Sequence, residues 1–433
     1  MTSLLFVNQH YYPDVASTGQ HLTDLAEHLA REGYAVEVLA SRGRYVAGRM
    51  NVPARELRNG VRIRRVRTTA FGRRSHLGRI IDYLSFYLHV LAALLFGPRR
   101  DGVIFLTTPP LLCVLGSIAR LLRGQVYGIW SMDLHPDAEI ASGMLRAGSP
   151  LARLLEWANA TGYRRASLVV DLGPYMKQRL VANGVAAERT HTVNVWSAKE
   201  EILPTPRDEN PLIDALGLRE KFVVMYSGNA GLVHDFRDIC QAMRLLDGDP
   251  RIQFLFVGDG PRRAEIEQFA GTHGLRNFAY RGYFERDQLR WSLPLADVHL
   301  ISLRAPFVGI SVPGKLYGIM AAARPAVFVG PERCESAETI LRAGCGAVVD
   351  PEQLSASAAP GGHPAAERIA ALLRCWADQP AVAQALGARG RRAFLAEYER
   401  EGNCRAFGNA IATVWPARQP AAAPVARPTA AVA

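Results

Sequence analysis

One stretch of the sequence, GISVPGKLYGIMAAARPAVFVG from Gly309 to Gly330, decides how the chain folds. The apolar run at 298–303 precedes it and predicts a buried strand. Pro313 suits the first turn of a helix, and apolar residues at helical spacing follow until Pro325 ends the helix before a strand at 326–329. A strand, a turn and a helix in this order predict a parallel α/β unit with a ligand site at the turn.

Lys315 lies at the predicted start of that helix. A helix N-terminus attracts anions, because its free N–H groups and its dipole favour negative charge. Only four of the 51 basic residues are lysine, so an ammonium group at this place indicates a specific need. Lys315 is therefore a candidate phosphate contact, and the alternative is a solvated residue on an ordinary helix.

Length, composition and charge narrow the class of protein. A chain of 433 residues is too long for one typical domain, and an apolar content of 49% is ample for sizeable cores. The net charge of +11 comes mainly from arginine, with clusters at 64–67, 73–74 and 99–100. Such clusters favour a polyanionic partner, for example anionic lipid or a phosphorylated substrate. No nucleic-acid-binding motif accompanies the charge, so we expect no nucleic acid as a partner.

The cysteines and the first residues indicate the compartment. The six cysteines form no CxxC pair and several lie in apolar runs, which is typical of small buried residues in a reducing cytosol rather than of disulfides or zinc ligands. The chain starts with MTSLLFVN, which lacks the basic segment of a signal peptide and predicts a first strand. We therefore expect a cytoplasmic protein without structural zinc.

One segment qualifies this expectation. Residues 80–96 read IIDYLSFYLHVLAALLF and have arginines on both sides. At 17 residues, with Asp82 and His89 inside, the segment is short and polar for a membrane-spanning helix. Its aromatic and basic edges are typical of a helix that docks on a membrane surface, and a buried helix of the first domain fits equally well.

Strand-like and helix-like runs alternate along the chain, which predicts a parallel α/β fold. The alternation restarts after a proline-rich segment at 201–211, which we interpret as a linker. Residues 397–414 predict a last helix, and the Ala/Pro-rich residues after Pro416 predict disorder. We expect strands at 4–7, 35–40, 103–106, 126–130, 168–172 and 190–195, and in a second Rossmann-like unit at 222–226, 253–257, 278–281, 298–303 and 326–329.

The run PGKLY…MAAARP at 313–325 resembles the P-S-K-x-Y…M-A-x-G-x-P segment of glycosyltransferase family 4, most closely the branch that builds bacterial O-antigen, capsule and colanic-acid-type polysaccharides. Four more segments match in the family's order, so the resemblance extends to about Trp415. It implies the GT-B fold, in which two Rossmann-like domains are joined and a C-terminal helix crosses back to the first. We therefore expect an acceptor-side domain at 1–205, a nucleotide-sugar-binding domain at 206–395, the return helix at 396–416 and a disordered tail at 417–433.

The resemblance also implies an activity. Enzymes of this family are retaining, metal-independent transferases that move a sugar from a nucleotide donor and need no cofactor. A UDP-sugar is favoured as the donor, and a GDP-sugar is the runner-up. The expected acceptor is a lipid-linked glycan or another saccharide. The expected location is the cytoplasm, with peripheral association at the inner-membrane surface.

Two loops of the first half are candidates for the site. The loop after the first strand contains Thr18 and Gly19, and the family has a loop here that faces the donor phosphate and the acceptor. The segment SMDLHPD at 131–137 resembles D-x-x-P-E, from which family members place a polar residue near the transferred sugar. Asp133 and His135 are therefore candidate catalytic residues together with Lys315. The alternative is a capping aspartate and a surface histidine.

The loop YSGNAGLVH at 226–234 opens the second domain and resembles the branch's G-N-x-G signature. Two glycines between a strand and a helix predict a phosphate cradle, although no GK[ST] follows, so the loop is not a P-loop. Asn229 and His234 stand where many relatives carry Arg and Lys, which moves charge neutralisation toward Lys315 and nearby arginines. The resemblance implies the following donor contacts: Thr18, Gly19, Gly228, Asn229, Gly231, His234, Gly258, Gly260, Arg281, Ser311, Pro313 and Gly314. Of these, Gly258 and Gly260 are expected to serve the turn rather than the ligand.

Two carboxylates of the family pattern are missing. Many members carry Glu-x7-Glu, whose second Glu holds the donor ribose, and here Ile310 and Gly318 stand in those places. This departure leaves the ribose without its usual partner and allows a catalytically inactive protein that binds a nucleotide sugar. A sugar-nucleotide epimerase of the same fold is another alternative, but it does not need the lipid surface that residues 80–96 indicate.

Overall fold

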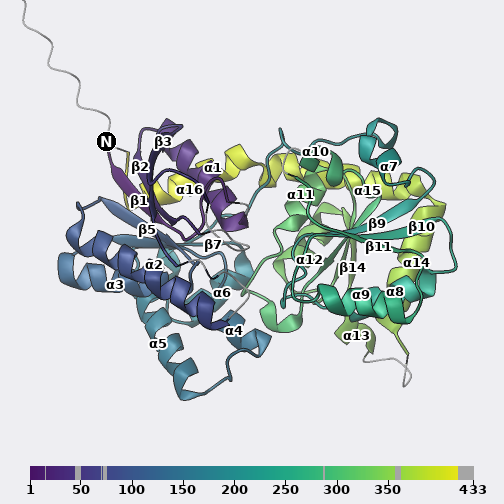
Figure 1. Ribbon diagram of the computed structural model, residues 1–433, viewed down its shortest axis with the longest axis horizontal. Helices are drawn as coiled ribbons and strands as arrows, with labels where there is room; N and C mark the ends of the chain where they lie inside the picture. Colours follow the sequence, from purple (N-terminus) through teal and green to yellow (C-terminus); the bar gives the residue numbers. More distant parts are fainter. Residues whose placement is uncertain are drawn as a thin grey trace, which may run out of the picture. The chain divides into compact units, whose positions relative to one another are not determined.

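A computed structural model describes residues 1–14, 16–43, 50–69, 71, 76–285, 288–355 and 362–417. It contains two β-sheets with helices packed on their faces (Figure 1). The arginines at 73–74 and the tail from residue 418, on which two of the expectations above rest, lie outside these residues.

The first sheet has eight strands. They are β1 (Ser3–Val7), β2 (Ala35–Ser41), β3 (Arg55–Arg58), β4 (Val61–Val66), β5 (Gly102–Leu106), β6 (Tyr127–Trp130), β7 (Leu168–Asp171) and β8 (Thr190–Thr192). Their order across the sheet is β3-β4-β2-β1-β5-β6-β7-β8. Strand β1 pairs in parallel with β2 and β5, whereas β3 pairs with β4 in the antiparallel direction. The expected strands are therefore present, and the β3–β4 hairpin is an addition.

The hairpin changes the interpretation of one arginine cluster. Along β4, Val61, Ile63 and Arg65 are buried, so the alternation that marks a half-buried strand includes a charged residue. Arg65 donates to Glu56 at 2.7 Å and to the Tyr12 carbonyl oxygen at 2.9 Å. This arginine is buried at the edge of the sheet. It is therefore not available to the polyanionic partner that the cluster at 64–67 suggested.

The helices that follow the strands of this sheet are α1 (Ser17–Arg31), α2 (His76–Phe96), α3 (Leu112–Arg123), α4 (Asp137–Ser142), α5 (Pro150–Arg165) and α6 (Pro174–Ala182). Helix α1 buries Leu22, Leu25, Ala26 and Leu29, which recur at helical spacing. The spacing thus places one apolar stripe against the sheet, as the sequence predicts.

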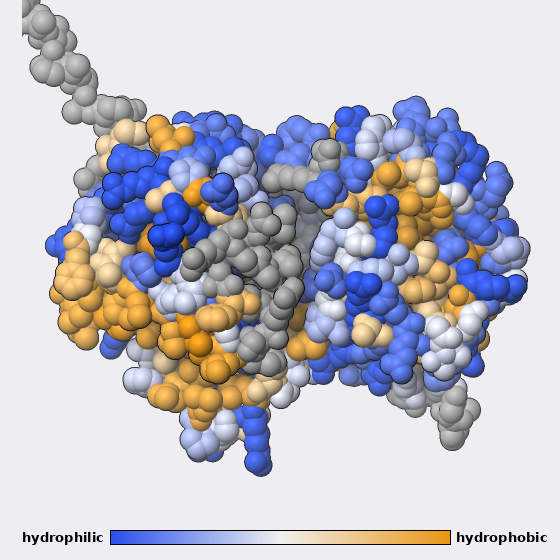
Figure 2. Space-filling model, viewed as in Figure 1, coloured by the Kyte–Doolittle hydropathy of each residue, from blue (hydrophilic) through white to orange (hydrophobic). Residues whose placement is uncertain are grey.

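Helix α2 is only partly covered. Leu77–Phe96 is long and apolar enough to cross a membrane by length and composition, yet only 22% of it is buried. Phe86 and Val90 pack inward, whereas Leu84 and Leu88 are exposed. Figure 2 shows hydrophobic residues gathered along this part of the surface. The alternative of a buried helix is therefore wrong.

The second sheet has six strands. They are β9 (Phe222–Ser227), β10 (Ile252–Val257), β11 (Phe278–Arg281), β12 (Val298–Ser302), β13 (Ala326–Val329) and β14 (Gly346–Val349). Their order is β11-β10-β9-β12-β13-β14, and every pairing is parallel. Alternate residues of β9 enter different cores, since Val224 joins a cluster on one face and Val223 joins a cluster on the other. This arrangement is the Rossmann-like order that was expected for the second half.

The helices around the second sheet are α7 (Pro211–Ala215), α8 (Arg237–Leu246), α9 (Arg263–Thr272), α10 (Leu289–Ser292), α11 (Lys315–Ala321), α12 (Glu335–Ala343), α13 (Pro351–Ser355), α14 (Pro364–Asp378) and α15 (Pro380–Ala393). The last helix, α16 (Arg400–Ala412), is shorter than the predicted span of 397–414. A π-helical turn precedes it, and Glu399 has extended backbone angles, so the chain breaks there before α16 begins.

The chain forms two compact units. Unit 1 contains Met1–Trp130, Arg165–Leu168 and the chain from Phe407 onward, and unit 2 contains Ser131–Arg164 and Val169–Ala406. Helix α16 therefore begins in unit 2 and ends in unit 1, which is the return to the first half that the fold class implies. The exact domain ranges 1–205, 206–395, 396–416 and 417–433 stay predictions.

The returning end of the chain is part of the core of unit 1. The Phe407 ring lies 4.7 Å from the Trp130 ring. A Cβ atom on Gly102 of β5 would be 2.7 Å from the Trp415 ring, so the glycine makes room for the indole. The Tyr34 hydroxyl donates to the Trp415 carbonyl oxygen at 3.1 Å. Residues 277 to 381 positions apart thus pack together in one unit.

Candidate functional site

The strand order of unit 2 creates a switch point between β9 and β12. The sheet continues from β9 to β10 and β11 on one side and from β12 to β13 and β14 on the other, so the loops after these two central strands lead in opposite directions. Open parallel α/β sheets bind ligands at this point, outside the carboxyl ends of the strands. The loops after Ser227 and Ser302 carry most of the predicted donor contacts.

Lys315 places its ammonium group at this switch point. Its Nζ atom is buried and has no hydrogen-bond partner among the described residues, and it lies 3.7 Å from the centre of the Tyr226 ring on β9. A Cβ atom on Gly228 would be 3.4 Å from Nζ, so the backbone after β9 borders it on another side. Burial lowers the pKa of Lys315 to about 7. A buried amine without an anionic partner is unfavourable, and a bound anion would relieve that penalty.

The helix that begins at Lys315 is shorter than the sequence predicts. It ends at Ala321, and Ala323 has a φ of 55°, outside the right-handed helical region. Pro325 disfavours helical geometry at the residue before it, which explains the early end. With only seven residues, α11 has a weak dipole, so the charge of Lys315 rather than the helix terminus is the main attraction for an anion.

Backbone hydrogen bonds hold the loops after β9 and β10 together. The Gly228 N–H donates to the Val257 carbonyl oxygen at 2.9 Å, and the Ala230 N–H donates to the Asp259 carbonyl oxygen at 2.7 Å. Gly258 has a φ of 132°, and a Cβ atom there would be only 2.1 Å from the Gly228 carbonyl oxygen. Only glycine fits this close approach, so Gly258 fixes the position of the Gly228 loop.

The remaining residues of the Gly228 loop are held in the same way. The Tyr226 hydroxyl donates to the Asn229 carbonyl oxygen at 2.9 Å. The Asn229 amide nitrogen would be 3.0 Å from a Cβ atom on Gly231, so its side chain folds over that glycine. Gly260, like Gly258, lies against backbone, because its Cβ atom would be 2.5 Å from the Ala230 carbonyl oxygen.

His234 supplies no charge to the site. Its Nδ1 donates to the Ser302 carbonyl oxygen at 2.5 Å, and burial lowers the pKa of the ring to about 3. The imidazole is therefore neutral at pH 7. The Asp235 N–H also donates to the Ser302 hydroxyl at 2.9 Å. His234 thus ties the loop after β9 to the end of β12, and its neutral ring offers no charge to an anion.

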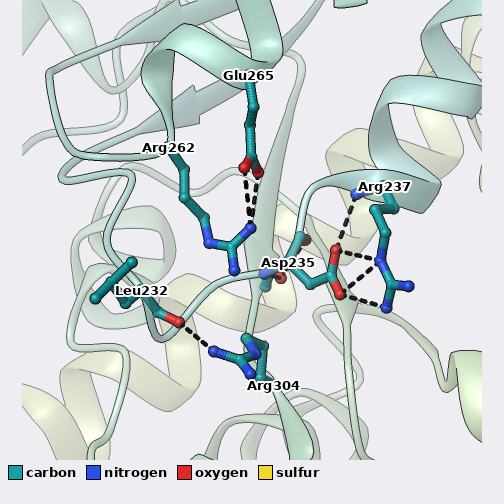
Figure 3. Close-up of polar contacts among 7 residues, drawn as sticks. Leu232, Asp235, Arg237, Arg262, Glu265 and Arg304 are labelled. Carbon is teal, nitrogen blue, oxygen red and sulfur yellow. Dashed lines mark hydrogen bonds and ion pairs between the residues drawn. The ribbon is translucent and has the colours of Figure 1, made fainter. Parts of the chain in front are cut away.

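Two arginines bring positive charge to this loop from opposite sides (Figure 3). Arg304, which follows β12, donates to the Leu232 carbonyl oxygen at 3.0 Å. Arg262, which precedes α9, donates to Glu265 at 2.8 Å, and its Nε is buried without a hydrogen-bond partner among the described residues. Arg262 and Arg304 are therefore candidates for the positive charge that Asn229 and His234 do not supply.

The segment with Asp133 and His135 reaches the same region of unit 2. Asp133 forms an isolated antiparallel bridge with Ser311, and the Leu134 N–H donates to the Ile310 carbonyl oxygen at 3.0 Å. Ser311 lies four residues before Lys315 in the same loop. The structure therefore places two segments that were predicted to carry catalysis next to one another, although they are about 180 residues apart in the sequence.

Glu139 orients His135, and the sequence analysis did not single out this residue. The His135 Nδ1 lies 2.9 Å and 3.0 Å from the two Glu139 carboxylate oxygens. Burial by itself lowers the pKa of His135, but the hydrogen bond to Glu139 and the nearby carboxylates of Asp133 and Asp137 outweigh it, so the pKa is raised. With Nδ1 turned to Glu139, Nε2 is the ring nitrogen that a substrate can meet. The i, i+4 spacing of His135 and Glu139 was the available signal.

Other predicted contacts lie around this region with structural roles of their own. The Arg281 guanidinium stacks 3.9 Å above the Phe284 ring at the end of β11. Pro313 and Gly314 form the turn before α11, since their carbonyl oxygens accept from the N–H groups of Leu316 and Tyr317 at 3.3 Å each.

Thr18 and Gly19 belong to unit 1, in the first turn of α1. The Thr18 hydroxyl accepts from the Asn8 amide at 3.4 Å. A Cβ atom on Gly19 would be 3.1 Å from the His10 carbonyl oxygen, so this glycine lets α1 pack on the loop after β1.

The positions of the two missing carboxylates are both buried. Ile310 is part of the core, and a Cβ atom on Gly318 would be 3.2 Å from Leu293 Cδ1 and 3.6 Å from Ile202 Cδ1. Apolar side chains therefore fill the space beside Gly318. No carboxylate therefore stands at either place.

Comparisons with known proteins agree with this picture. Residues 18–196 match the family described as Glycosyl transferase 4-like domain. The probable glycosyltransferase WbjE of Pseudomonas aeruginosa is 27% identical over 249 residues, which cover 57% of this chain and 62% of that protein. The putative colanic acid biosynthesis glycosyl transferase WcaI of Escherichia coli (strain K12) is 25% identical over 372 residues, which cover 82% of this chain and 89% of that protein.

A solved structure shows the fold over nearly the whole length. Anabaena Alr3699/HepE in complex with UDP-glucose superimposes with a TM-score of 0.68 and 14% sequence identity, covering 95% of this chain and 100% of that chain. At this identity the likeness shows the fold alone.

Two Rossmann-like halves, a switch-point site in the second and a last helix that returns to the first define a protein of the GT-B class. Within that class, residues 18–196 match the glycosyl transferase 4-like family, and the resemblance to the bacterial polysaccharide branch of glycosyltransferase family 4 is confirmed.

Proposed function

We propose that this protein is a retaining, metal-independent glycosyltransferase that moves a sugar from a nucleoside-diphosphate sugar to a lipid-linked or saccharide acceptor in bacterial cell-surface polysaccharide biosynthesis. The observation that carries the proposal is Lys315, whose buried Nζ lies at the switch point of unit 2 without a hydrogen-bond partner among the described residues. A doubly negative diphosphate is the ligand that best fits a buried amine beside glycine-rich backbone. The names of the relatives WbjE and WcaI support the activity and the pathway class.

In the proposed reaction the diphosphate leaves as the glycosidic bond breaks, and its negative charge grows. Lys315 is fixed in place before the reaction, so it stabilises this charge more in the transition state than in the ground state. Arg262 and Arg304 add positive potential from either side of the loop after β9. The acceptor hydroxyl attacks from the same face, and its proton passes to the departing phosphate oxygen. The configuration at the sugar carbon is thereby retained.

Asp133 and His135 would hold the transferred sugar or the acceptor. Their segment pairs with Ser311 and Ile310, so it lies beside the loop that leads to Lys315. The raised pKa of His135 keeps its ring protonated to a higher pH than usual, and a cationic ring with Nδ1 on Glu139 presents an Nε2–H donor. Such a donor suits a sugar hydroxyl.

A UDP-sugar is the first choice for the donor, because the structural neighbour HepE binds UDP-glucose and shares the fold over 95% of this chain. A GDP-sugar is the second choice. The absence of a carboxylate at Gly318 favours one further candidate, a protein that binds nucleotide sugar without turning it over.

One experiment separates these candidates. The melting temperature of the protein is measured with UDP, GDP and ADP and with their glucose, galactose and N-acetylglucosamine or mannose derivatives, because a ligand that binds only the folded state raises it. Release of free nucleoside diphosphate from the best ligand is then followed with and without added acceptor saccharide. Stabilisation with release supports a transferase, and stabilisation without any release supports the inactive binder. No stabilisation by any nucleotide contradicts the proposal.

We also propose that the protein docks on the inner-membrane surface through α2 and the end of α3. Leu84, Leu88 and Phe96 of α2 are exposed, as are Leu121 and Leu122 of α3. Arg123 joins the two helices, because it donates to the carbonyl oxygens of Leu94 and Gly97 at 2.9 Å each. A continuous apolar surface with arginines at its border is typical of a monotopic membrane contact.

Flotation with vesicles tests the membrane contact. The protein should rise with vesicles that contain anionic phospholipid and should be released by high salt, since surface charges are screened. The double variant Leu84→Glu/Leu88→Glu should stay in the soluble fraction, because two charges on the apolar face oppose insertion. The control Leu57→Glu alters a residue on β3 that is equally exposed and should float like the wild type. Equal flotation of all three proteins would contradict the proposal.

A further inference from the structure

A groove in unit 2 adjoins the His135 segment and is separate from the loops that surround Lys315. Its volume is about 680 Å³, which is within the range of ~300–1,000 Å³ typical of sites for small ligands. Helix α5 forms one wall, and the end of α6 with the residues after it forms the other. Leu134, Pro136 and Asp137 also line the groove, so it reaches the residues on either side of His135.

The wall formed by α5 is polar and aromatic. Residues 153, 156, 157, 160 and 164 recur at helical spacing and line the groove together. A helix normally packs such a stripe against the protein, but here Trp157 is 63% exposed. The side chains of Arg153, Glu156 and Arg164 form no hydrogen bond or ion pair with another side chain in the part of the chain that the structure describes.

The other surfaces of the groove complete a mixed lining. Asn183 offers both a donor and an acceptor on the wall after α6. Tyr163 lies at the base, where its hydroxyl is 3.0 Å from the Ser131 hydroxyl and its ring is buried. An indole face, two guanidinium groups, a carboxylate and an amide are thus presented to one space.

We propose that this groove binds the saccharide part of the acceptor, with a pyranose ring stacked on Trp157 and its hydroxyls bound by Arg153, Glu156 and Asn183. The proposal rests on the proposed glycosyltransferase function and adds the place and the chemical class of the second substrate. A pyranose has one apolar face of C–H groups, which suits an aromatic ring, and a rim of hydroxyls that both donate and accept.

Other occupants fit this lining less well. An acyl chain would bury Arg153 and Glu156 without partners, which is unfavourable. The carboxylates of Glu156 and Asp137 balance the two arginines that line the groove, so the lining has no net positive charge to select a polyanion. The position is also consistent with a saccharide acceptor, because Pro136 and Asp137 belong both to the groove and to the segment that carries His135. A chain of sugars in the groove would therefore end beside the proposed catalytic histidine.

Ligand-observed saturation-transfer NMR tests the groove directly. The probes are the methyl glycosides of glucose, galactose, mannose, rhamnose, fucose and N-acetylglucosamine, and the proteins are the wild type, Trp157→Ala, Trp157→Phe and Leu154→Ala. Leu154 is the matched control, since it is an exposed apolar residue on the same helix but does not line the groove. We expect at least one glycoside to bind the wild type at millimolar concentration. Its binding should weaken tenfold or more in Trp157→Ala, persist in Trp157→Phe and be unchanged in Leu154→Ala.

The outcomes distinguish this proposal from the proposed function. If no glycoside binds the wild type, or if Trp157→Ala binds as well as the wild type, the groove is not a saccharide site. Stabilisation by UDP is measured on the same four proteins and should be identical, because none of the substitutions lies near Lys315. If UDP does not raise the melting temperature of the wild type, the nucleotide-sugar function is contradicted. The NMR result alone then decides whether a saccharide binds at Trp157.

Discussion

Replacing Lys315 by methionine removes the ammonium group and keeps an unbranched chain over the Tyr226 ring. In the free protein the Nζ is buried without a hydrogen-bond partner among the described residues, and burial lowers the pKa of Lys315 to about 7. The variant should therefore fold with equal or greater stability, since it no longer buries an amine. Turnover should fall about 10²–10³-fold, or about 2.7–4 kcal/mol, which is typical of losing one preorganised contact to developing charge.

The pH dependence gives this prediction a distinct signature. A bound diphosphate stabilises the protonated form of Lys315, so donor affinity should decrease as the pH rises above 7, by up to about tenfold per pH unit. Stability should change in the opposite direction. The folded-state pKa lies below the ordinary value of 10.5, so the unfolded chain binds more protons between pH 7 and 10.5, and the wild type should gain stability relative to the methionine variant as the pH rises through that window.

Calorimetric titration with UDP at several pH values, combined with a release assay, measures both effects. Lys315→Arg should recover activity only in part, because a planar guanidinium does not reproduce a point charge at one atom. Lys221→Met is the control, since that lysine lies in the same unit and donates to the Pro250 carbonyl oxygen on an exposed surface. If Lys315→Met kept turnover within a few-fold of the wild type, or bound UDP with unchanged pH dependence, Lys315 would not contact the diphosphate and the site would have to be sought elsewhere.

Three further predictions concern the neighbouring segments. His135→Ala should lower turnover about 10²-fold and leave UDP binding unchanged, with no more than the small loss of stability expected from breaking its contact with Glu139; near-native turnover would remove His135 from the site. Glu139→Gln should destabilise the protein by about 0.5 kcal/mol below pH 6.5, and the difference should vanish as the pH rises through the raised pKa of His135, which denaturant titration at pH 5.5 and 8.5 can measure. Gly258→Ala should destabilise it by about 1–3 kcal/mol because of its positive φ and the clash with backbone, whereas Gly248→Ala, with open space around it, should change stability by less than about 0.5 kcal/mol; similar values for both would refute this account.

Segments with regular hydrophobic spacing that are bounded by glycine or proline predicted the fold well. The apolar runs at 222–226 and 298–303 became neighbouring central strands, β9 and β12, because buried parallel strands are nearly continuous hydrophobic segments. The hairpin of β3 and β4 was not predicted, since a buried arginine in β4 interrupts the apolar alternation and its partner Glu56 lies on the other strand. The early end of α11 was also not predicted. It depends on the positive φ of Ala323, whereas the spacing of the apolar residues continues as in a helix.

The candidate site was predictable in its local motifs but not in its combinations. The position of Lys315 after a Pro-Gly turn identified a possible anion contact, yet its cover by Tyr226 depends on the pairing of two strands that are far apart in the sequence. The neutral state of His234 also depends on burial, which no motif specifies. Ser311 and Asp133 meet through a tertiary bridge, so their proximity could not be read from either segment alone.

The return of the chain to unit 1 imposes an order on its synthesis. Phe407 and Trp415 complete a core whose other members, among them Trp130 and Gly102, are translated hundreds of residues earlier. At roughly 5–20 residues per second, the nascent first unit waits on the ribosome for about 14–55 s, the time needed to make the intervening segment, before its last helix emerges. During that interval the indole pocket is open to solvent. The second unit, whose residues end at Ala406, can therefore finish folding first, although it is encoded later.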